Sequence, residues 1–239
     1  MTDNYFLMQA TSEQLKTIII FAQLESDFLA KLALGSKVQS YKKIEILIHE
    51  GDLLLPKLYA VLEGKLSAQK FSSSGKETIL RQLMPGEIFA APALFGDRIA
   101  PATVVALQDT KIVTIEKETL LEVIQLAPNI ALQILSCFNQ RLQEMHQTIH
   151  GLMSERAIIR LLRLIIYTAK RYGFEKTTEG IFLNQKLPYR QMARMIGITY
   201  EECVRLMKRD LNSTIIYRRG GNITIKSLAE LEELLWQMN

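Results

Sequence analysis

Between about Val38 and Ile115 the chain alternates apolar and polar residues in short runs, a period of two that is typical of β-strands with one buried face. Turn residues such as Gly64 and the Pro85-Gly86 pair separate the runs, which include KIEILI, LYAVLE, TVVAL and TKIVTI. Strands repeating every 8 to 12 residues or so predict a β-sandwich or barrel. Residues 11–34 instead place apolar residues at helical spacing, which predicts short helices before the sheet.

A long amphipathic helix is predicted after Pro128. Its flanks are polar, and its apolar stripe is narrower than the stripe of a helix that packs into its own domain. The pattern therefore favours a two-stranded coiled coil, and hence a homodimer, over an ordinary packed helix. Gly151 and Ser154 then interrupt the pattern and predict a hinge. The a/d seam begins at Ala131 and continues through Leu135, Phe138, Leu142, Met145, Ile149 and Leu152.

Residues 187–211, LPYRQMARMIGITYEECVRLMKRDL, carry the pattern of a helix-turn-helix. Ala193 is the small residue inside the first helix, and Gly197 follows where the turn needs left-handed backbone. The Thr199 hydroxyl is suited to cap the second helix by accepting a free amide of its first turn. A helical pair in an ordinary core is the alternative interpretation. The predicted buried side consists of Leu187, Met192, Ile196, Ile198, Cys203, Val204, Leu206 and Leu211.

The segments on either side of this motif complete a domain. Another amphipathic helix is predicted at residues 155–172, and residues 173–186 are expected to form a loop with one short extended piece. After the motif, two β-rich runs joined through Gly220-Gly221-Asn222 predict a hairpin, and a helix is expected from Ser227. A helix-turn-helix followed by a hairpin is a winged helix-turn-helix.

Length and composition allow two ordinary domains in 239 residues, with 48% hydrophobic and 23% charged residues. The longest apolar run, from Ile158, is cut by Arg160 and Arg163, so no membrane span is expected. The start of the chain does not resemble a signal peptide. Its two cysteines, Cys137 and Cys203, cannot build a disulfide framework. These features favour a cytoplasmic location.

The charge is unevenly divided along the chain. Residues 154–239 carry 15 Lys and Arg against 9 Asp and Glu, a net +6, whereas residues 1–153 carry 14 against 16, a net −2. A solvated basic face would give the same counts. Because the excess coincides with the helix-turn-helix, it indicates that the C-terminal part meets phosphates.

The order of β-rich domain, heptad helix and winged helix-turn-helix resembles the CRP/FNR (catabolite activator / fumarate-nitrate regulator) family of bacterial transcription regulators. Residues 51–95 are similar to the effector domain of that family, and residues 187–211 to its DNA-reading motif. The resemblance implies an α+β fold in three parts. These are a cyclic-nucleotide-binding-like β-roll (jelly roll) with N-terminal helices at 1–127, a coiled-coil dimerisation helix at 128–153 and a winged helix-turn-helix DNA-binding domain at 154–239.

Family members that bind cyclic AMP use a cassette that begins with Gly-Glu and ends with Arg-Ser. Gly86-Glu87 matches the start, but the Arg-Ser positions fall on Ala100 and Pro101, and Pro101 has no N–H for an anion. A polar pair on the long helix that meets adenine is replaced by a methionine and a histidine. The resemblance thus implies that cyclic AMP is not the effector, and Glu87 is expected to persist as a turn residue. The candidate effector pocket is Gly86, Glu87, Ala100, Pro101, Met145 and His146.

Metal-based sensing and enzymatic activity are not expected. An iron–sulfur centre would need N-terminal cysteines, and none precedes Cys137. His146 and His150 are four residues apart on a helix, but they lack neighbouring cysteine or carboxylate ligands, so neither haem nor a metal ion is expected. The sequence contains no catalytic triad order, P-loop or dinucleotide fingerprint. A small organic metabolite, a protein partner or no effector at all remain open.

The resemblance places the base-reading positions on Tyr200, Glu201 and Arg205. Glutamate accepts a hydrogen bond from cytosine N4 and arginine donates to guanine O6 and N7, so this pair is expected to read the GA step of a half-site. Many family members have arginine at the position of Tyr200, and tyrosine cannot make the same fork to a guanine. An i, i+4 salt bridge between Glu201 and Arg205 is the alternative.

Phosphate contacts are expected from Arg190, Thr199, Lys208, Arg218 and Arg219. The implied partners are double-stranded DNA, a second copy of the chain, an unknown small-molecule effector or none, and RNA polymerase if the protein activates transcription. No membrane partner is expected. The alternative function is a cyclic-nucleotide-type regulatory or scaffold module without sequence-specific DNA binding, which would leave the wing and the basic C-terminal part without a role.

Overall fold

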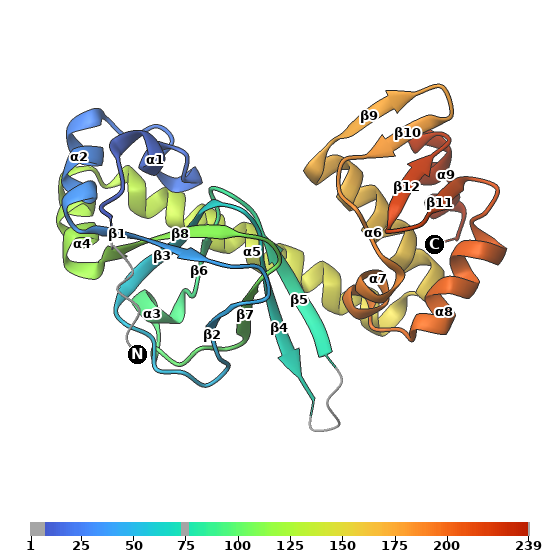
Figure 1. Ribbon diagram of the computed structural model, residues 1–239, viewed down its shortest axis with the longest axis horizontal. Coiled ribbons are helices and arrows are strands. Elements are labelled where there is room, and N and C mark those ends of the chain that lie inside the picture. The colour runs from blue at the N-terminus through green and yellow to red at the C-terminus, as the bar shows by residue number, and fades with distance from the viewer. Residues whose placement is uncertain (1–7, 73–76, 239) are drawn as a thin grey trace. The chain divides into compact units, whose positions relative to one another are not determined.

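The computed structural model describes residues 8–72 and 77–238, apart from the side chains of residues 152 and 153. The predicted seam residue Leu152 therefore has no described side chain. Contacts between Cα atoms divide the chain into two compact units, Met1–Arg141 and Leu142–Asn239. Figure 1 shows the elements of both units, which are described in turn.

Short helices precede the first sheet, as the helical spacing of residues 11–34 predicts. They are α1 (Ser12–Lys16), the 3₁₀ turn η1 (Ile19–Phe21) and α2 (Ser26–Leu34). A capping box starts α1, because the Thr11 hydroxyl accepts from the Gln14 amide while the Gln14 side chain accepts from the Thr11 amide. Leu15, Leu29 and Leu32 are buried on one side of these helices.

Two four-stranded antiparallel sheets form the β-roll of the first unit (Figure 1). Their strand orders are β1-β8-β3-β6 and β2-β7-β4-β5. Val61 and Ile112 from the first sheet pack with Leu66, Leu83 and Ala106 from the second in one buried cluster. The strands are β1 (Ser36–Tyr41), β2 (Ile46–Ile48), β3 (Lys57–Glu63), β4 (Leu66–Phe71), β5 (Glu77–Leu83), β6 (Ile88–Phe89), β7 (Thr103–Ala106) and β8 (Thr110–Glu116).

Three helices complete the roll: α3 (Pro92–Phe95), α4 (Lys117–Leu126) and the first turns of α5 (Asn129–Ser154). Ile130 and Ile134 of α5 are buried against the helices and β-strands of the first unit. The helix continues through Gly151 and ends at Ser154, so the break falls at Ser154 rather than at Gly151, and the hinge stays a prediction. A glycine inside a helix costs only about 1 kcal/mol, which the rest of a long helix can absorb.

The second unit begins with α6 (Ala157–Tyr172) and contains one four-stranded sheet in the order β11-β12-β10-β9. The remaining elements are β9 (Phe174–Thr177), β10 (Gly180–Leu183), α7 (Tyr189–Ile196), α8 (Tyr200–Arg205), the π-helical turn η2 (Leu206–Asp210), β11 (Ile215–Arg218), β12 (Asn222–Ile225) and α9 (Leu228–Met238). The predicted hairpin is confirmed as β11 and β12, which pair from Ile215↔Ile225 to Arg218↔Asn222.

Residues 173–186 form a hairpin rather than a loop with one extended piece, and that prediction is wrong. Strand β9 pairs with β10, which in turn pairs with β12 of the wing. All four residues of β9 are exposed, so the strand lacks the apolar alternation by which strands are recognised. Gly180, at φ +131°, starts the returning strand in a conformation that side chains rarely adopt.

Within the described ranges, no single helix is long and apolar enough to span a membrane. Helices α4 and α5 taken together have the length and composition of a membrane span, but the chain bends by 115° between them.

Candidate nucleic-acid interface

The helix-turn-helix is built from α7 and α8 around the predicted turn. Gly197 ends α7 at φ 72° and ψ 33°, a left-handed conformation that is costly for residues with a Cβ. The amides of Gly197 and Ile198 both donate to the Ala193 carbonyl. Thr199 then caps α8 by accepting from the Glu202 amide at 3.1 Å. The predicted turn and cap are therefore confirmed.

The recognition helix does not stop at Arg205 but widens into the π-helical turn η2, in which the Leu211 amide donates to the Leu206 carbonyl at 3.1 Å. Such turns are rare and often lie at functional sites. The predicted apolar side is buried except for the partly exposed Val204. Burial, reinforced by the nearby Glu202 carboxylate, raises the pKa of the Cys203 thiol to about 12.

Arg160 of α6 supports this motif, a role that the sequence did not indicate. Its Nε donates to the Ile196 carbonyl at 3.1 Å, and Nη1 donates to the Glu155 carbonyl at 2.7 Å. Carbonyls in the last turn of a helix lack intrahelical partners, and the guanidinium satisfies one of them. Arg160 thus ties the end of α7 to the start of α6.

The three predicted base-reading residues project from the start of the recognition helix. Glu201 and Arg205 are exposed, and Tyr200 is 46% exposed. Glu201 and Arg205 are four positions apart in the sequence, so both lie on one face of the helix. The carboxylate near Arg205 is that of Glu202, at 3.8 Å and i, i+3. Glu201 is exposed on the same face of the helix as Arg205.

The five predicted phosphate contacts are all exposed, Arg190, Lys208 and Arg219 among them. Arg218 is ion-paired with Glu179 of the β9–β10 turn, so the strand hairpin missed by the sequence holds one of these arginines. Thr199 accepts through its hydroxyl at the cap, which leaves the hydroxyl proton available to donate.

The tip of the wing is in close contact with the start of the motif. The Leu187 amide donates to the Gly221 carbonyl at 2.7 Å. A Cβ on Gly221 would lie 2.5 Å from the Pro188 nitrogen, and Gly221 has φ +90°. Only glycine permits this approach. A Cβ added to Gly220, which has φ +87°, would meet no atom within 4 Å.

Three tyrosines join the wing to the recognition helix, a cluster that sequence reasoning missed. Tyr189 of α7 stacks on Tyr217 of β11 with ring centroids 3.9 Å apart, and it meets Tyr200 of α8 edge to face at 6.2 Å. Burial, followed by the neighbouring Tyr217, raises the pKa of Tyr189 to about 12. Burial also raises the pKa of Tyr217, although backbone hydrogen bonds from Tyr189 and Gly221 act to lower it.

The predicted effector residues lie in three parts of the structure: the β5–β6 turn, the loop before β7, and α5. The Glu87 carboxylate lies 3.2 Å from an Arg81 nitrogen and accepts from the Met84 amide at 3.1 Å, so it holds the β5–β6 turn. Gly86 lies in the same turn at φ +86°. Ala100 is buried in the core between the sheets and Pro101 is exposed. Met145 and His146 are exposed on the part of α5 that belongs to the second unit.

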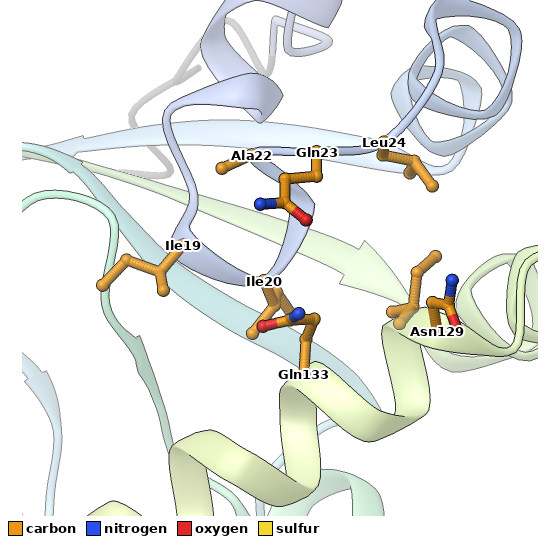
Figure 2. A pocket seen from close by; sticks show the side chains of 8 residues that line it. Ile19, Ile20, Ala22, Gln23, Leu24, Asn129 and Gln133 are labelled. Atoms are coloured by element: carbon orange, nitrogen blue, oxygen red, sulfur yellow. The ribbon is translucent and has the colours of Figure 1, made fainter.

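A pocket does lie elsewhere in the first unit, between residues 19–24 and the first turns of α5 (Figure 2). Gln23 stands on one wall, and Asn129 and Gln133 stand on the other. Its lining includes none of the six candidate effector residues, all of which are described. Among the described residues, no group of three or more His, Cys, Asp or Glu is placed to hold a metal ion.

The heptad stripe of α5 is largely uncovered. Leu135 is 63% exposed, Leu142 50%, Met145 46% and Ile149 50%. Phe138 differs, because it is partly buried and meets Phe95 edge to face at 5.9 Å. Phe138 thus packs on its own β-roll, while the four exposed seam residues form an apolar stripe on the helix surface.

The chain is similar to known proteins both in sequence and in fold. The model of the cyclic nucleotide-binding domain matches residues 38–126. The Cyclic AMP receptor protein of Thermus thermophilus is 23% identical over 194 residues, which cover 81% of this chain and 86% of that protein. The Fumarate and nitrate reduction regulatory protein of Vibrio cholerae is 26% identical over 183 residues, covering 75% and 71%. A CooA variant from Carboxydothermus hydrogenoformans shares the fold, with a TM-score of 0.75 and 20% identity over 93% of this chain and 99% of its own.

A cyclic-nucleotide-binding-type β-roll in one unit and a winged helix-turn-helix in the other define a class of transcription regulators. Within that class, the chain is similar to regulators of the CRP/FNR family over most of its length.

Proposed function

We propose that the protein is a homodimeric, sequence-specific DNA-binding transcription regulator that reads palindromic sites with GA-containing half-sites. One observation carries the proposal. Glu201 and Arg205 are exposed on one face of a helix whose start is fixed by Gly197 and by the Thr199 cap. This is the arrangement by which a recognition helix presents side chains to a major groove.

The chemistry of the two residues supports the half-site. A carboxylate accepts from the cytosine N4 amino group and a guanidinium donates to guanine O6 and N7. Tyr200 lies one residue earlier and faces the next base outward, where a phenol cannot reproduce an arginine fork. Arg190, Thr199, Lys208, Arg218 and Arg219 hold the phosphates on both sides and supply affinity rather than sequence information.

Dimerisation follows from the α5 stripe, because exposed leucine, methionine and isoleucine at heptad positions lose contact with water when a second copy binds. Two recognition helices then meet successive grooves about 34 Å apart, which is why the site is a palindrome. The proposed domains are the effector-type β-roll at 1–127, the dimerisation helix at 128–153 and the DNA-binding domain at 154–239. RNA polymerase is the partner if the regulator activates transcription.

Cyclic AMP is not the effector in this proposal, and neither haem nor a metal cofactor takes part. The Glu87 carboxylate is already engaged by Arg81 and the Met84 amide, and an alanine and a proline stand where an arginine and a serine would hold the phosphate. A buried phosphate without an arginine partner would be poorly compensated. An unidentified small molecule, or none, controls the protein.

Selection of random duplex DNA by the full-length protein without added ligand tests the function. Enrichment of a two-fold palindrome with GA in each half-site is the expected result. Weak, salt-sensitive binding without enrichment would mean that an effector or partner is required. The absence of any salt-dependent binding to duplex DNA would overturn the proposed function and favour a scaffold module. Cyclic AMP at a concentration far above that of the protein should leave both the selected sequence and the thermal unfolding midpoint unchanged, because only a ligand of the folded state raises that midpoint.

A further inference from the structure

Two contacts in the second unit connect the wing to the helix-turn-helix. The wing tip touches the start of α7 through the Leu187–Gly221 hydrogen bond at 2.7 Å. A continuous row of rings then runs from β11 through α7 to the first residue of α8. The row ends on Tyr200, which the proposed function places at the outer base of each half-site.

We propose that the wing sets the base preference at the outer position of the half-site, because Tyr217, acting through Tyr189, holds the Tyr200 ring in one orientation. This proposal rests on the proposed function and deepens it. Tyr217 and Tyr189 are positioning residues, since Tyr200 alone among the three is assigned to a base.

The geometry of the row supports a fixed orientation. Tyr189 and Tyr217 are stacked at 3.9 Å with their planes 19° apart, and Tyr189 meets Tyr200 at 6.2 Å with the planes 85° apart. Stacked and edge-to-face pairs are the arrangements that aromatic rings prefer, so each contact restricts the next ring. Tyr189 and Tyr217 are partly buried while Tyr200 is 46% exposed, so the row leads from the protein toward the solvent.

The anchored end of the row is the wing. Tyr217 belongs to β11 of the wing, and its ring is stacked on that of Tyr189 of α7, with the ring centroids 3.9 Å apart. Because Gly221 cannot accept a Cβ beside Pro188, the wing tip has little room to shift relative to α7. Tyr217 is therefore held from both the strand and the helix.

The chemical consequence concerns one base pair. A freely rotating phenol at the start of α8 would offer its hydroxyl to any base or phosphate in reach, as either donor or acceptor. A ring held in one orientation presents the hydroxyl at one place and favours the base whose edge complements it there. Sequence preference at the outer position would then depend on Tyr217, although Tyr217 lies in the wing.

The experiment is selection of random duplex DNA by full-length Tyr217→Leu, Tyr217→Phe and Tyr200→Leu, each beside the wild type. We expect the wild type to prefer one outer base by about fivefold or more, the usual discrimination at a contacted base pair. Tyr217→Leu should reduce that preference to within about twofold of equality while the inner GA preference changes by less than about twofold. Tyr217→Phe keeps the ring and should retain most of the outer preference.

Two further variants separate positioning from general damage. The double variant Tyr217→Leu with Tyr200→Leu should match Tyr200→Leu alone, because residues that act through one contact are not additive. Tyr167→Leu removes a tyrosine of the edge-to-face pair with Tyr172 on α6 and should leave every base preference unchanged. Circular dichroism of each variant confirms that the winged domain is folded.

The proposal fails if Tyr217→Leu weakens all sequences equally with the outer preference intact, or if it removes the inner GA preference as well. It also fails if the wild type selects a GA palindrome with no preference at the outer base. A wild type that does not bind duplex DNA at all would instead overturn the proposed function, so the two failures are distinguishable.

Discussion

At the scale of single residues, Arg205 and Lys208 are both cationic and exposed on the same recognition element, yet they are expected to contribute differently to binding. Arg205→Ala should abolish the preference at one base pair, because a bidentate contact to guanine is lost. Lys208→Ala should weaken binding to all sequences alike and reduce the slope of log affinity against log salt by about 1. Competition binding to specific and random duplexes over a salt series measures both effects. Equal losses on both duplexes from Arg205→Ala would falsify its base-reading role.

The tyrosine row also predicts a dependence on alkaline pH. Tyr189 has a pKa of about 12 in the folded protein against 10.0 for the free side chain, and Cys203 about 12 against 9.0. Both pKa values are raised by folding, so the stability that these groups contribute is complete below about pH 9 and is lost as pH rises toward 12. The free energy of unfolding should therefore fall across this window.

Ultraviolet absorbance of tyrosinate, followed as the pH is raised, checks the raised pKa of Tyr189. In the wild type a fraction of the eight tyrosines should ionise only near the pH at which the winged domain unfolds. Tyr189→Phe should remove one late-titrating group without changing the tyrosines that ionise near pH 10. If Tyr189→Phe instead removes a tyrosine that ionises near pH 10, Tyr189 is solvated and its ring is not held in the stack on Tyr217.

At the scale of elements, the wing turn offers a matched pair of glycines for a test. Gly220→Ala places a Cβ in open space at φ +87°, so it should cost only the left-handed strain of about 1 kcal/mol. Gly221→Ala adds a Cβ 2.5 Å from the Pro188 nitrogen and should cost at least about 2 kcal/mol. Urea denaturation followed by circular dichroism compares the two variants. Similar midpoints for both would mean that the wing tip is not docked on α7.

Elements with strict local requirements could be predicted from the sequence, and elements defined by distant contacts could not. Gly197 and Thr199 satisfy a turn and a cap whose chemistry is contained in a few consecutive residues, and both predictions are confirmed. Strand β9 is exposed throughout and exists because β10 offers it an edge, which no local pattern reveals. The Tyr189–Tyr217 stack and the Arg160–Ile196 hydrogen bond likewise join residues far apart in the chain.

At the scale of the whole molecule, the seam residues illustrate what a heptad pattern does and does not predict. The pattern correctly marks α5 as a helix with an apolar stripe, because a period of 3.5 residues is a local property. It assigns Phe138 to the same seam as Leu142. In the structure, Phe138 packs partly on its own roll beside Phe95, whereas Leu142 is half exposed. Spacing identifies the face of a helix, and only packing shows what covers that face.

Assembly through this stripe is the prediction that concerns the whole protein. Leu142→Glu places a charge where two copies of α5 would meet, so the desolvation of the carboxylate opposes the gain from burying apolar surface. Because the substitution occurs twice in a dimer, the dissociation constant should rise by at least about 100-fold, which corresponds to about 3 kcal/mol. Sedimentation equilibrium should show a dimer for the wild type and a monomer for the variant.

Gln143→Glu is the matched control, since it adds the same charge one position away at an exposed polar residue, and it should remain dimeric. Binding to DNA then separates assembly from base reading. The monomeric Leu142→Glu protein should bind a full palindrome no better than a single half-site, because two linked recognition helices gain affinity from their effective concentration. Its preference for GA within the half-site should persist, because Glu201 and Arg205 are unchanged. A Leu142→Glu protein that stays dimeric would place the dimer interface elsewhere than on the α5 stripe.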